Sequence, residues 1–398
     1  MPMARECWLG AVRLSRIRTD SPSCSNRAPR NRPTGPAPTI STSNMVRALE
    51  RAGVAESMAA EGVRIERGVA RSGGREVARL SFAQASATWP FVLSLKQTRT
   101  EAILASRVAE LDPTALVRGV CITSLHDAGT FVTLTGHHNV EVLSAREPRA
   151  QAVAATAPDP TAQAPTFAAR LVIGADGARS TIRTLTGIPT TGREYPDNYL
   201  MGDFPDTGSD GAAAVLHLEP GGIVESFPVP GGLRRWVVHT GSLLADARAT
   251  DLASLIQQRT GAQVDAAANS MLSAFGVRST MATRMVAGRV VLLGDAAHEI
   301  SPIGGQGMNL GWLDAAALAP IMVAALRGEN TGEQLKAFER QRRRASLKVA
   351  RQAWLNMVLG RARPTSFLTL LHTILRPLFR LRWVQNLTIR RFTMHGRG

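Results

Sequence analysis

The sequence has few of the residues that define disulfide-stabilised or metal-binding proteins. Its 398 residues include three cysteines, Cys7, Cys24 and Cys121, without the paired spacing of a zinc site. This odd set excludes an extracellular disulfide scaffold and favours a reducing compartment. No apolar run reaches the roughly 20 residues that span a bilayer, and the nearest run is Phe367–Phe379. The start, MPMARECWLG, lacks the apolar segment of a secretory signal. We therefore expect a cytoplasmic protein.

Acidic residues are absent from the C-terminal part of the chain. Of the 47 basic residues, 14 lie from Arg340 onward, where no Asp or Glu occurs, and the remaining 33 nearly balance 31 acidic ones. The formal charge of +16 therefore comes mostly from the C-terminal tail, and it says little about the chemistry of the central part of the chain. Solvated helices packed on the domain or peripheral docking on an anionic membrane would both explain this tail. No nucleic-acid motif is found, so we expect no nucleic-acid partner.

Hydrophobic periodicity alternates along the chain between helical and strand patterns. A short helix is expected from Met45 with an interruption at Gly53, and a second from about Thr98 to Glu110. The runs ARLVIGADG and RVVLLGDAAH are unbroken and apolar, which is typical of strands buried on both faces. Alternating runs such as RRWVVHT, set between Gly/Pro turns, predict an antiparallel sheet. The sequence thus predicts an α/β domain with a β-rich insertion.

The most informative segment runs from Arg289 to Ala319. A buried strand ends at Gly294-Asp295, and a glycine-rich loop from Pro302 to Gly307 opens a helix near Met308. An aspartate at the carboxyl end of a strand can accept hydrogen bonds from polyol hydroxyls, and glycines let the backbone approach a flat ring. The free amides at the start of the helix can stabilise negative charge on that ring. This pattern predicts a cofactor site.

A second segment, Leu171 to Arg183, ends a strand at Asp176-Gly177. On a helix, Arg179 and Arg183 would share a face, and their guanidiniums could pair with phosphates. The alternative is that this helix face is simply exposed to water. His298, which follows Ala296 and Ala297, is interpreted as a packed turn residue rather than a base.

Two acidic residues of the β-rich insertion are further candidates for substrate contact. The spacing of Asp203 and Glu225 does not distinguish residues that contact a substrate from residues that are merely exposed at the surface. We assign no catalytic residue and no metal ligand.

Together these segments resemble the class A flavoprotein monooxygenases, the para-hydroxybenzoate hydroxylase-like group. Gly294-Asp-Ala-Ala-His298, followed by Pro302 and Gly-Gln-Gly-Met-Asn309, is similar to the second flavin-binding motif of that family. Gly174-Ala-Asp-Gly177 with Ser180 and Arg183 is similar to its Asp-Gly motif. Gln97 with Glu101 and Leu104 resembles a helix start near the flavin ribityl chain. The likeness covers about residues 34 to 395.

The resemblance implies an α/β fold with an incomplete, discontinuous Rossmann-like FAD-binding domain. An antiparallel β-sheet substrate domain is inserted into it, and a helical tail follows. We expect an irregular segment at 1–44, the first FAD-domain part with some substrate-side sheet at 45–189, the β-rich substrate domain at 190–283, the second FAD-domain half at 284–330 and basic helices at 331–398.

The resemblance also implies which residues contact the cofactor. Asp295 would contact the ribityl chain, and Asp176 would lie near the pyrophosphate. The implied cofactor-binding residues are Gln97, Asp176, Gly294, Asp295, Pro302, Gly304, Gly305, Gln306, Gly307, Met308 and Asn309.

The implied reaction reduces FAD with NADPH or NADH, binds molecular oxygen as a flavin C4a-hydroperoxide and hydroxylates an aromatic or related lipophilic small molecule. The alternatives are a flavin-dependent reductase or epoxidase, and a non-catalytic relative that no longer holds FAD.

One part of the family pattern is not found. No strand followed by Gly-x-Gly-x-x-Gly occurs in residues 1–52, which contain only Gly10 and Gly35. If that unit supplies two or three charge-assisted hydrogen bonds, about 3 to 9 kcal/mol of FAD binding is expected to be missing. We interpret the Arg/Pro/Ser-rich start as a misassigned start or a frameshift, with a native irregular tail as the alternative. Pro36 replaces an expected arginine, and Pro320 is expected to kink its helix.

Overall fold

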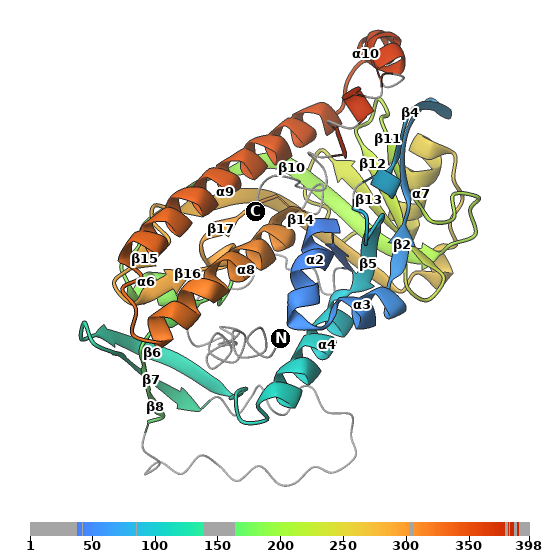
Figure 1. Cartoon of the computed structure of the whole chain (residues 1–398). Helices are drawn as coiled ribbons and strands as arrows, with labels where there is room; N and C mark the ends of the chain where they lie inside the picture. The colour runs from blue at the N-terminus through green and yellow to red at the C-terminus, as the bar shows by residue number, and fades with distance from the viewer. Residues whose placement is uncertain are drawn as a thin grey trace.

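The computed structural model describes residues 38–41, 43–84, 86–138, 164–301, 306–378, 381, 383–385 and 388–389. Within these residues the strands form four sheets, and two long helices run along one flank of the molecule (Figure 1). The Arg/Pro/Ser-rich start at 1–37 and most of the Ala/Pro/Thr-rich connection, 145–163, lie outside the described residues.

The first described segments pack two helices against a small sheet. Helices α2 (Ser43–Ala52) and α3 (Ala55–Glu61) are separated at Gly53, whose φ of 73° lies in the left-handed region. This confirms the predicted helix with a break at Gly53. Their apolar side chains pack on a sheet in which β5 (Val92–Lys96) lies between β1 (Pro38–Ser41) and β2 (Val63–Ile65). Strand β1 lies inside the segment that the sequence predicts as irregular.

The largest sheet has eight strands in the order β17-β14-β10-β13-β12-β11-β3-β4. Its neighbours pair antiparallel except β11 and β3, which pair parallel. The bounds are β3 Arg67–Ser72, β4 Arg75–Ser81, β10 Thr190–Pro205, β11 Ala213–His217, β12 Val224–Val229, β13 Leu233–Thr240, β14 Met271–Ala282 and β17 His298–Glu299. The predicted antiparallel insertion is confirmed.

The two faces of this sheet carry separate cores. Helix α7 (Ala249–Thr260) covers one face through Leu252 and Ile256. On the other face, Tyr199 and Val237 belong to a core that β2, β5 and the C-terminal helices complete.

Two small sheets and the short helix α6 complete the strand-rich part. One sheet has the order β15-β16-β9 and the other β6-β7-β8. The bounds are β6 Val120–Asp127, β7 Val132–His138, β8 Thr166–Ala169, β9 Val172–Gly174, α6 Thr181–Leu185, β15 Val286–Ala287 and β16 Val290–Leu292.

Two long helices, α8 (Gln306–Leu326) and α9 (Gly332–Gly360), pack side by side, and α10 (Thr365–Leu378) follows at one end of the molecule (Figure 1). Pro320 lies inside α8, which continues uninterrupted to Leu326. By length and composition α8 is apolar enough to cross a membrane, which corrects the expectation that no stretch of the chain is. Its buried residues Leu310, Leu318 and Met322 pack within the protein.

Candidate functional site

The structure brings the two sequence motifs together at one sheet edge. Strands β9 and β16 pair parallel, with Gly174 opposite Leu292. The amide of Leu293 donates to the carbonyl of Gly174 at 2.9 Å. Because parallel strands end at the same edge, the segments that begin with Asp176 and with Gly294 leave the sheet side by side. The two predicted strands are confirmed, and their parallel pairing is a finding of the structure.

Helix α8 approaches this edge through a contact between two glycines. Gly294 has a φ of 54°, which favours glycine, and begins a short 3-10 turn. A Cβ placed on Gly311 would lie 3.0 Å from the Gly294 Cα, so any side chain there would push the helix away. This contact holds the first turns of α8 over the strand end that carries Asp295.

Asp295 is accessible to solvent although protein atoms surround it. Desolvation raises the pKa of its carboxyl above the usual range, and repulsion from the Glu299 carboxylate adds to the effect. Glu299 itself accepts from Arg278 Nε at 2.7 Å. An accessible but crowded carboxyl is expected at the wall of a groove rather than on an open surface.

The first turn of α8 supplies polar atoms beside the same strand end. Gln306 and Asn309 are buried, and Met308 is partly exposed. The Oε1 atom of Gln306 is buried without a hydrogen-bond partner among the described residues. Gly307 leaves room for a close approach, since a Cβ there would meet only the carbonyl oxygen of Ile300 at 3.5 Å. The predicted residues Pro302, Gly304 and Gly305 lie outside the described residues.

The Asp176 carboxylate organises the turn that follows β9. Its Oδ1 accepts from Ser180 Oγ at 2.5 Å, and its Oδ2 accepts from the amide of Ile182 at 3.0 Å. Ser180 accepts in turn from the amide of Arg183, so the two side chains cap the N-terminus of α6.

The suggestion that Arg179 and Arg183 share a helix face is wrong. This capping starts α6 at Thr181, which leaves Arg179 exposed in the preceding turn. Arg183 donates to the carbonyls of Ala296 and Ala178, each at 2.8 Å, and so ties the two strand-end segments together.

Gln97 is the first residue of α4 (Gln97–Leu111), as the sequence predicts. Its Nε2 donates to Glu101 Oε1 at 3.1 Å, and the side chain is half-buried. Helices α4 and α8 both contact β1, so the helix that carries Gln97 and the one that carries Gln306 approach the same strand.

Behind the glycine contact lies a buried ionic group that sequence analysis missed. His298 Nε2 lies 2.5 Å from Asp314 Oδ2, and Arg342 Nε donates to Asp314 Oδ1 at 2.6 Å. All three side chains are at most 1% exposed. The fold therefore gives His298 a carboxylate partner, and Arg342 belongs to the core rather than to a solvated basic tail. Asp314 was the sequence signal for this group, because it stands among apolar residues in α8 and a buried charge requires a partner.

The large sheet carries a second set of buried polar groups. Asp203 accepts from Arg235 Nε and Nη2 at 2.6 and 2.7 Å, so it forms a buried ion pair instead of lying on the surface. Glu225 lies between Ile223 and Phe227 on the apolar face that also carries Tyr199. Desolvation raises the pKa of Glu225 to about 7, a value suited to proton transfer near neutral pH.

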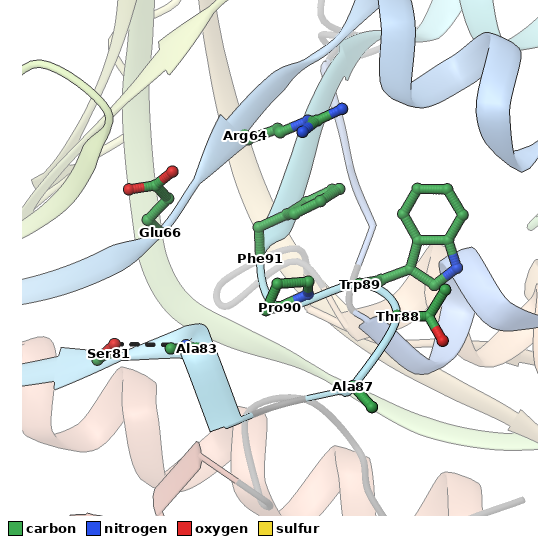
Figure 2. A pocket seen from close by; sticks show the side chains of 9 residues that line it. All are labelled: Arg64, Glu66, Ser81, Ala83, Ala87, Thr88, Trp89, Pro90 and Phe91. Carbon is green, nitrogen blue, oxygen red and sulfur yellow. Dashed lines mark hydrogen bonds between the residues drawn. The ribbon is translucent and has the colours of Figure 1, made fainter.

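A hollow of about 530 Å³ lies between β2 and the loop before β5 (Figure 2). The guanidinium of Arg64 lies 5.0 Å from the centroid of the Phe91 ring, and Trp89 Nε1 donates to Glu50 Oε1 at 2.7 Å. None of the predicted cofactor residues that the structure describes lines this hollow. The hollow therefore lies apart from the edge at which the Asp176 and Asp295 segments leave β9 and β16.

The donor set at the β9/β16 edge fits an elongated polar organic group. It offers an accessible aspartate, an unpartnered buried amide oxygen, a helix start and glycines at points of close approach. The described residues contain no group of three or more His, Cys, Asp or Glu side chains that could hold a metal ion. The arrangement suits a flavin nucleotide.

Comparison with known proteins agrees with this geometry. A family model described as "FAD binding domain" matches residues 26–353. The chain is 29% identical over 351 residues to 6-methylpretetramide 4-monooxygenase of Streptomyces rimosus, covering 86% of this chain and 57% of that protein. It is 28% identical to 12-dehydrotetracycline 5-monooxygenase/anhydrotetracycline 6-monooxygenase of S. rimosus subsp. rimosus, covering 79% of this chain and 60% of the relative. The chain thus spans little more than half the length of these two relatives.

Solved structures share the fold at low sequence identity. The p-nitrophenol 4-monooxygenase of Pseudomonas putida DLL-E4 superposes with a TM-score of 0.76 at 19% identity, covering 98% of this chain and 95% of the other. Klebsiella pneumoniae HpxO, solved with FAD and uric acid, gives a TM-score of 0.68 at 17% identity, covering 91% and 89%. At these identities the likeness establishes the fold.

Proposed function

Because the chain belongs to the FAD-binding-domain family, whose model matches residues 26–353, we propose that it is an FAD-dependent monooxygenase that uses NADPH or NADH. The observation that carries this proposal is the parallel pairing of β9 with β16, which brings the Asp176 and Asp295 segments to one edge beneath the first turn of α8. The monooxygenase names of the relatives support the reaction class.

In this proposal the cofactor residues are those predicted from the sequence. Asp295 binds the ribityl hydroxyls, and the side-chain amides of Gln306 and Asn309 hold the polar edge of the ring system. Asp176 acts by shaping the turn near the pyrophosphate, because both of its carboxylate oxygens already accept hydrogen bonds. FAD, when bound, supplies oxygen activation after reduction by the nicotinamide cofactor.

The protein's contribution is positioning and proton handling. Arg183 and the Gly294–Gly311 contact fix the two strand ends against α8. Glu225, with its pKa near 7, is our candidate for accepting a proton from a hydroxyl-bearing substrate on the inner face of the large sheet. We assign this role to Glu225 because it is half-buried and has no hydrogen-bond or ion-pair partner among the described residues.

The proposed substrate is a small aromatic or related lipophilic molecule, with molecular oxygen as co-substrate. The substrates named for relatives, which include 3-(3-hydroxy-phenyl)propionate, 12-dehydrotetracycline and anhydrotetracycline, support this class. The proposed location is the cytoplasm, with peripheral membrane contact through the C-terminal helices.

The test is consumption of NADPH or NADH by FAD-reconstituted protein, with p-nitrophenol and 3-hydroxyphenylpropionate as probes and isotopically labelled oxygen as co-substrate. Label in an organic product supports a monooxygenase. Nicotinamide consumption that leaves a reduced, unlabelled product would instead assign the chain to the reductases. If the protein does not bind FAD at all, the chain is a non-catalytic member of the family.

A further inference from the structure

Exposed apolar side chains gather at the C-terminal end of the described chain. Thirteen large hydrophobic residues are exposed among the described residues, and eight of them lie between 347 and 383. These eight, which we call the C-terminal apolar surface, are Leu347, Trp354, Leu355, Leu359, Phe367, Leu378, Leu381 and Trp383. Scattered single exposures are ordinary in soluble proteins, but such a concentration marks an interaction surface.

On α9, four of these side chains lie on one half of the helix, and we call these four the apolar stripe. Leu347 is followed after seven and eight residues by Trp354 and Leu355, and Leu359 lies one turn beyond Leu355, while Val349 is fully buried on the other side of the helix. The stripe runs over 13 residues, or about 18 Å of helix. Exposed fractions of 37 to 53% leave a large part of each of these side chains open among the described residues.

Exposed cations lie along the same half of α9. Arg344, Lys348 and Arg351 are all exposed, and no acidic residue occurs from 340 to the end of the sequence. Two arginines of this region already form ion pairs within the protein, Arg342 with Asp314 and Arg361 with Asp197. The exposed cations therefore have no protein carboxylate on their own helix half to neutralise them.

Aromatic rings on this surface also lie beside cations. The Arg363 guanidinium lies 5.2 Å from the Phe367 ring centroid, and Arg193 of β10 lies 5.9 Å from the Trp354 ring centroid. A helix face that combines tryptophan and leucine with arginine and lysine favours the boundary between lipid headgroups and acyl chains.

We propose that the C-terminal apolar surface docks the protein on an anionic membrane. The apolar stripe enters the headgroup boundary, and Arg344, Lys348 and Arg351 contact the phosphates and carboxylates of anionic lipids. A second copy of the chain fits less well, because a two-fold interface would place the same cations of both copies against one another. This docking does not depend on FAD and goes beyond the proposed reaction.

Membrane docking also has a structural consequence for the cofactor half. Helix α9 carries both the exposed stripe and the buried Arg342, whose partner Asp314 lies on α8. The membrane-facing surface and the middle of α8 are thus joined by a buried ion pair and by the apolar packing of the two helices, so docking would set the orientation of the cofactor edge relative to the lipid surface.

The test is cosedimentation of the full chain with vesicles of phosphatidylcholine alone or mixed with phosphatidylserine, at low and high salt. We expect binding only to the mixed vesicles and release at high salt. Arg344→Gln/Lys348→Gln/Arg351→Gln should weaken binding on the order of a hundredfold, at about fivefold per cation. Trp354→Ser/Leu355→Ser/Leu359→Ser should also release the protein.

The matched control is Val117→Ser/Phe131→Ser, which removes two exposed apolar side chains outside this surface. It should bind as the unmodified chain does, and thermal melts should show all variants folded. Equal binding to both kinds of vesicle, or binding unchanged in the two triple variants, would overturn the proposal. Absence of vesicle binding together with concentration-dependent dimerisation, lost in the Trp354 triple variant, would assign the surface to a second copy.

Discussion

His298 and Asp314 are joined by a buried contact of 2.5 Å between Nε2 and Oδ2. The contact links the segment just beyond Asp295 to the middle of α8, and Arg342 on α9 occupies the other carboxylate oxygen at 2.6 Å. Three elements that flank the proposed cofactor edge therefore share one carboxylate. Removing one of these three side chains would leave the remaining polar or charged groups buried without a partner. The loss in the free energy of unfolding would then exceed the stabilisation that the complete group provides.

Asp314→Ala should therefore destabilise the protein strongly. We expect a loss of about 3 to 5 kcal/mol in the free energy of unfolding, because Arg342 would remain buried without its counter-ion. Denaturant unfolding measures this loss. The matched control is Glu333→Ala, which breaks the exposed Glu333–Lys336 pair and should change stability little. A similar effect from both substitutions would contradict the structural role of Asp314.

Two glycines of α8 should respond differently to alanine. Gly307→Ala should leave the stability of the protein unchanged or slightly higher, because the Cβ would meet only the Ile300 carbonyl oxygen, at 3.5 Å, among the described residues outside its own helix turn. It should nevertheless lower FAD affinity at least about tenfold, because the added methyl group would enter the space of the cofactor. Gly311→Ala should lower stability by about 1 to 3 kcal/mol, because its Cβ meets Gly294. Thermal melts and FAD titration separate these outcomes. Unchanged FAD affinity in Gly307→Ala would place the cofactor elsewhere.

Glu225 should make stability depend on pH. Its pKa rises from 4.5 to about 7 on folding, so the folded state holds the proton more tightly and stability falls as pH rises through this window. Glu225→Gln should match the unmodified chain near pH 4.5 and exceed it by about 2 to 3 kcal/mol above pH 7. Unfolding measured across this pH range tests the difference. The exposed Glu194→Gln is the control, and parallel pH curves for both variants would refute a protonated Glu225.

The two arginines after β9 should have separable roles. Arg183→Ala should lower the free energy of unfolding by about 1 to 3 kcal/mol and weaken FAD binding, because it frees the Ala296 and Ala178 carbonyls that its guanidinium bridges. Arg179→Ala, at an exposed turn position, should leave stability unchanged. A larger loss of FAD affinity in Arg179→Ala than in Arg183→Ala would restore the phosphate-pairing hypothesis for Arg179.

Local patterns in the sequence predicted much of this fold. The unbroken apolar runs before Gly174 and Gly294 indicated buried strands, and β9 and β16 confirm them. The break at Gly53 and the start of α4 near Gln97 followed from helical periodicity and were also confirmed. These features depend on neighbours within a few residues, which a single sequence displays directly.

The buried polar contacts could not all be predicted from such local patterns. Arg342 stands in a run of arginines and is paired with an aspartate 28 residues earlier, so only the packing of α8 on α9 distinguishes it from its exposed neighbour Arg344. Glu225 did leave a signal, because it alternates with Ile223 and Phe227 on the apolar face of a strand. The effect of Asp176 and Ser180 on the start of α6 likewise required the hydrogen bonds themselves.

Fluorescence titration of FAD into the unmodified chain and into Asp295→Ala tests the central claim most directly. We expect saturable binding to the unmodified chain and a loss of about 1 to 3 kcal/mol, roughly 5- to 150-fold, in the variant, because a polar partner in a crowded site is removed. Asp246→Ala, at an exposed position, should bind as the unmodified chain does. Equal affinity for Asp295→Ala and the unmodified chain, or no FAD binding by either, would contradict a flavin site at the β9/β16 edge.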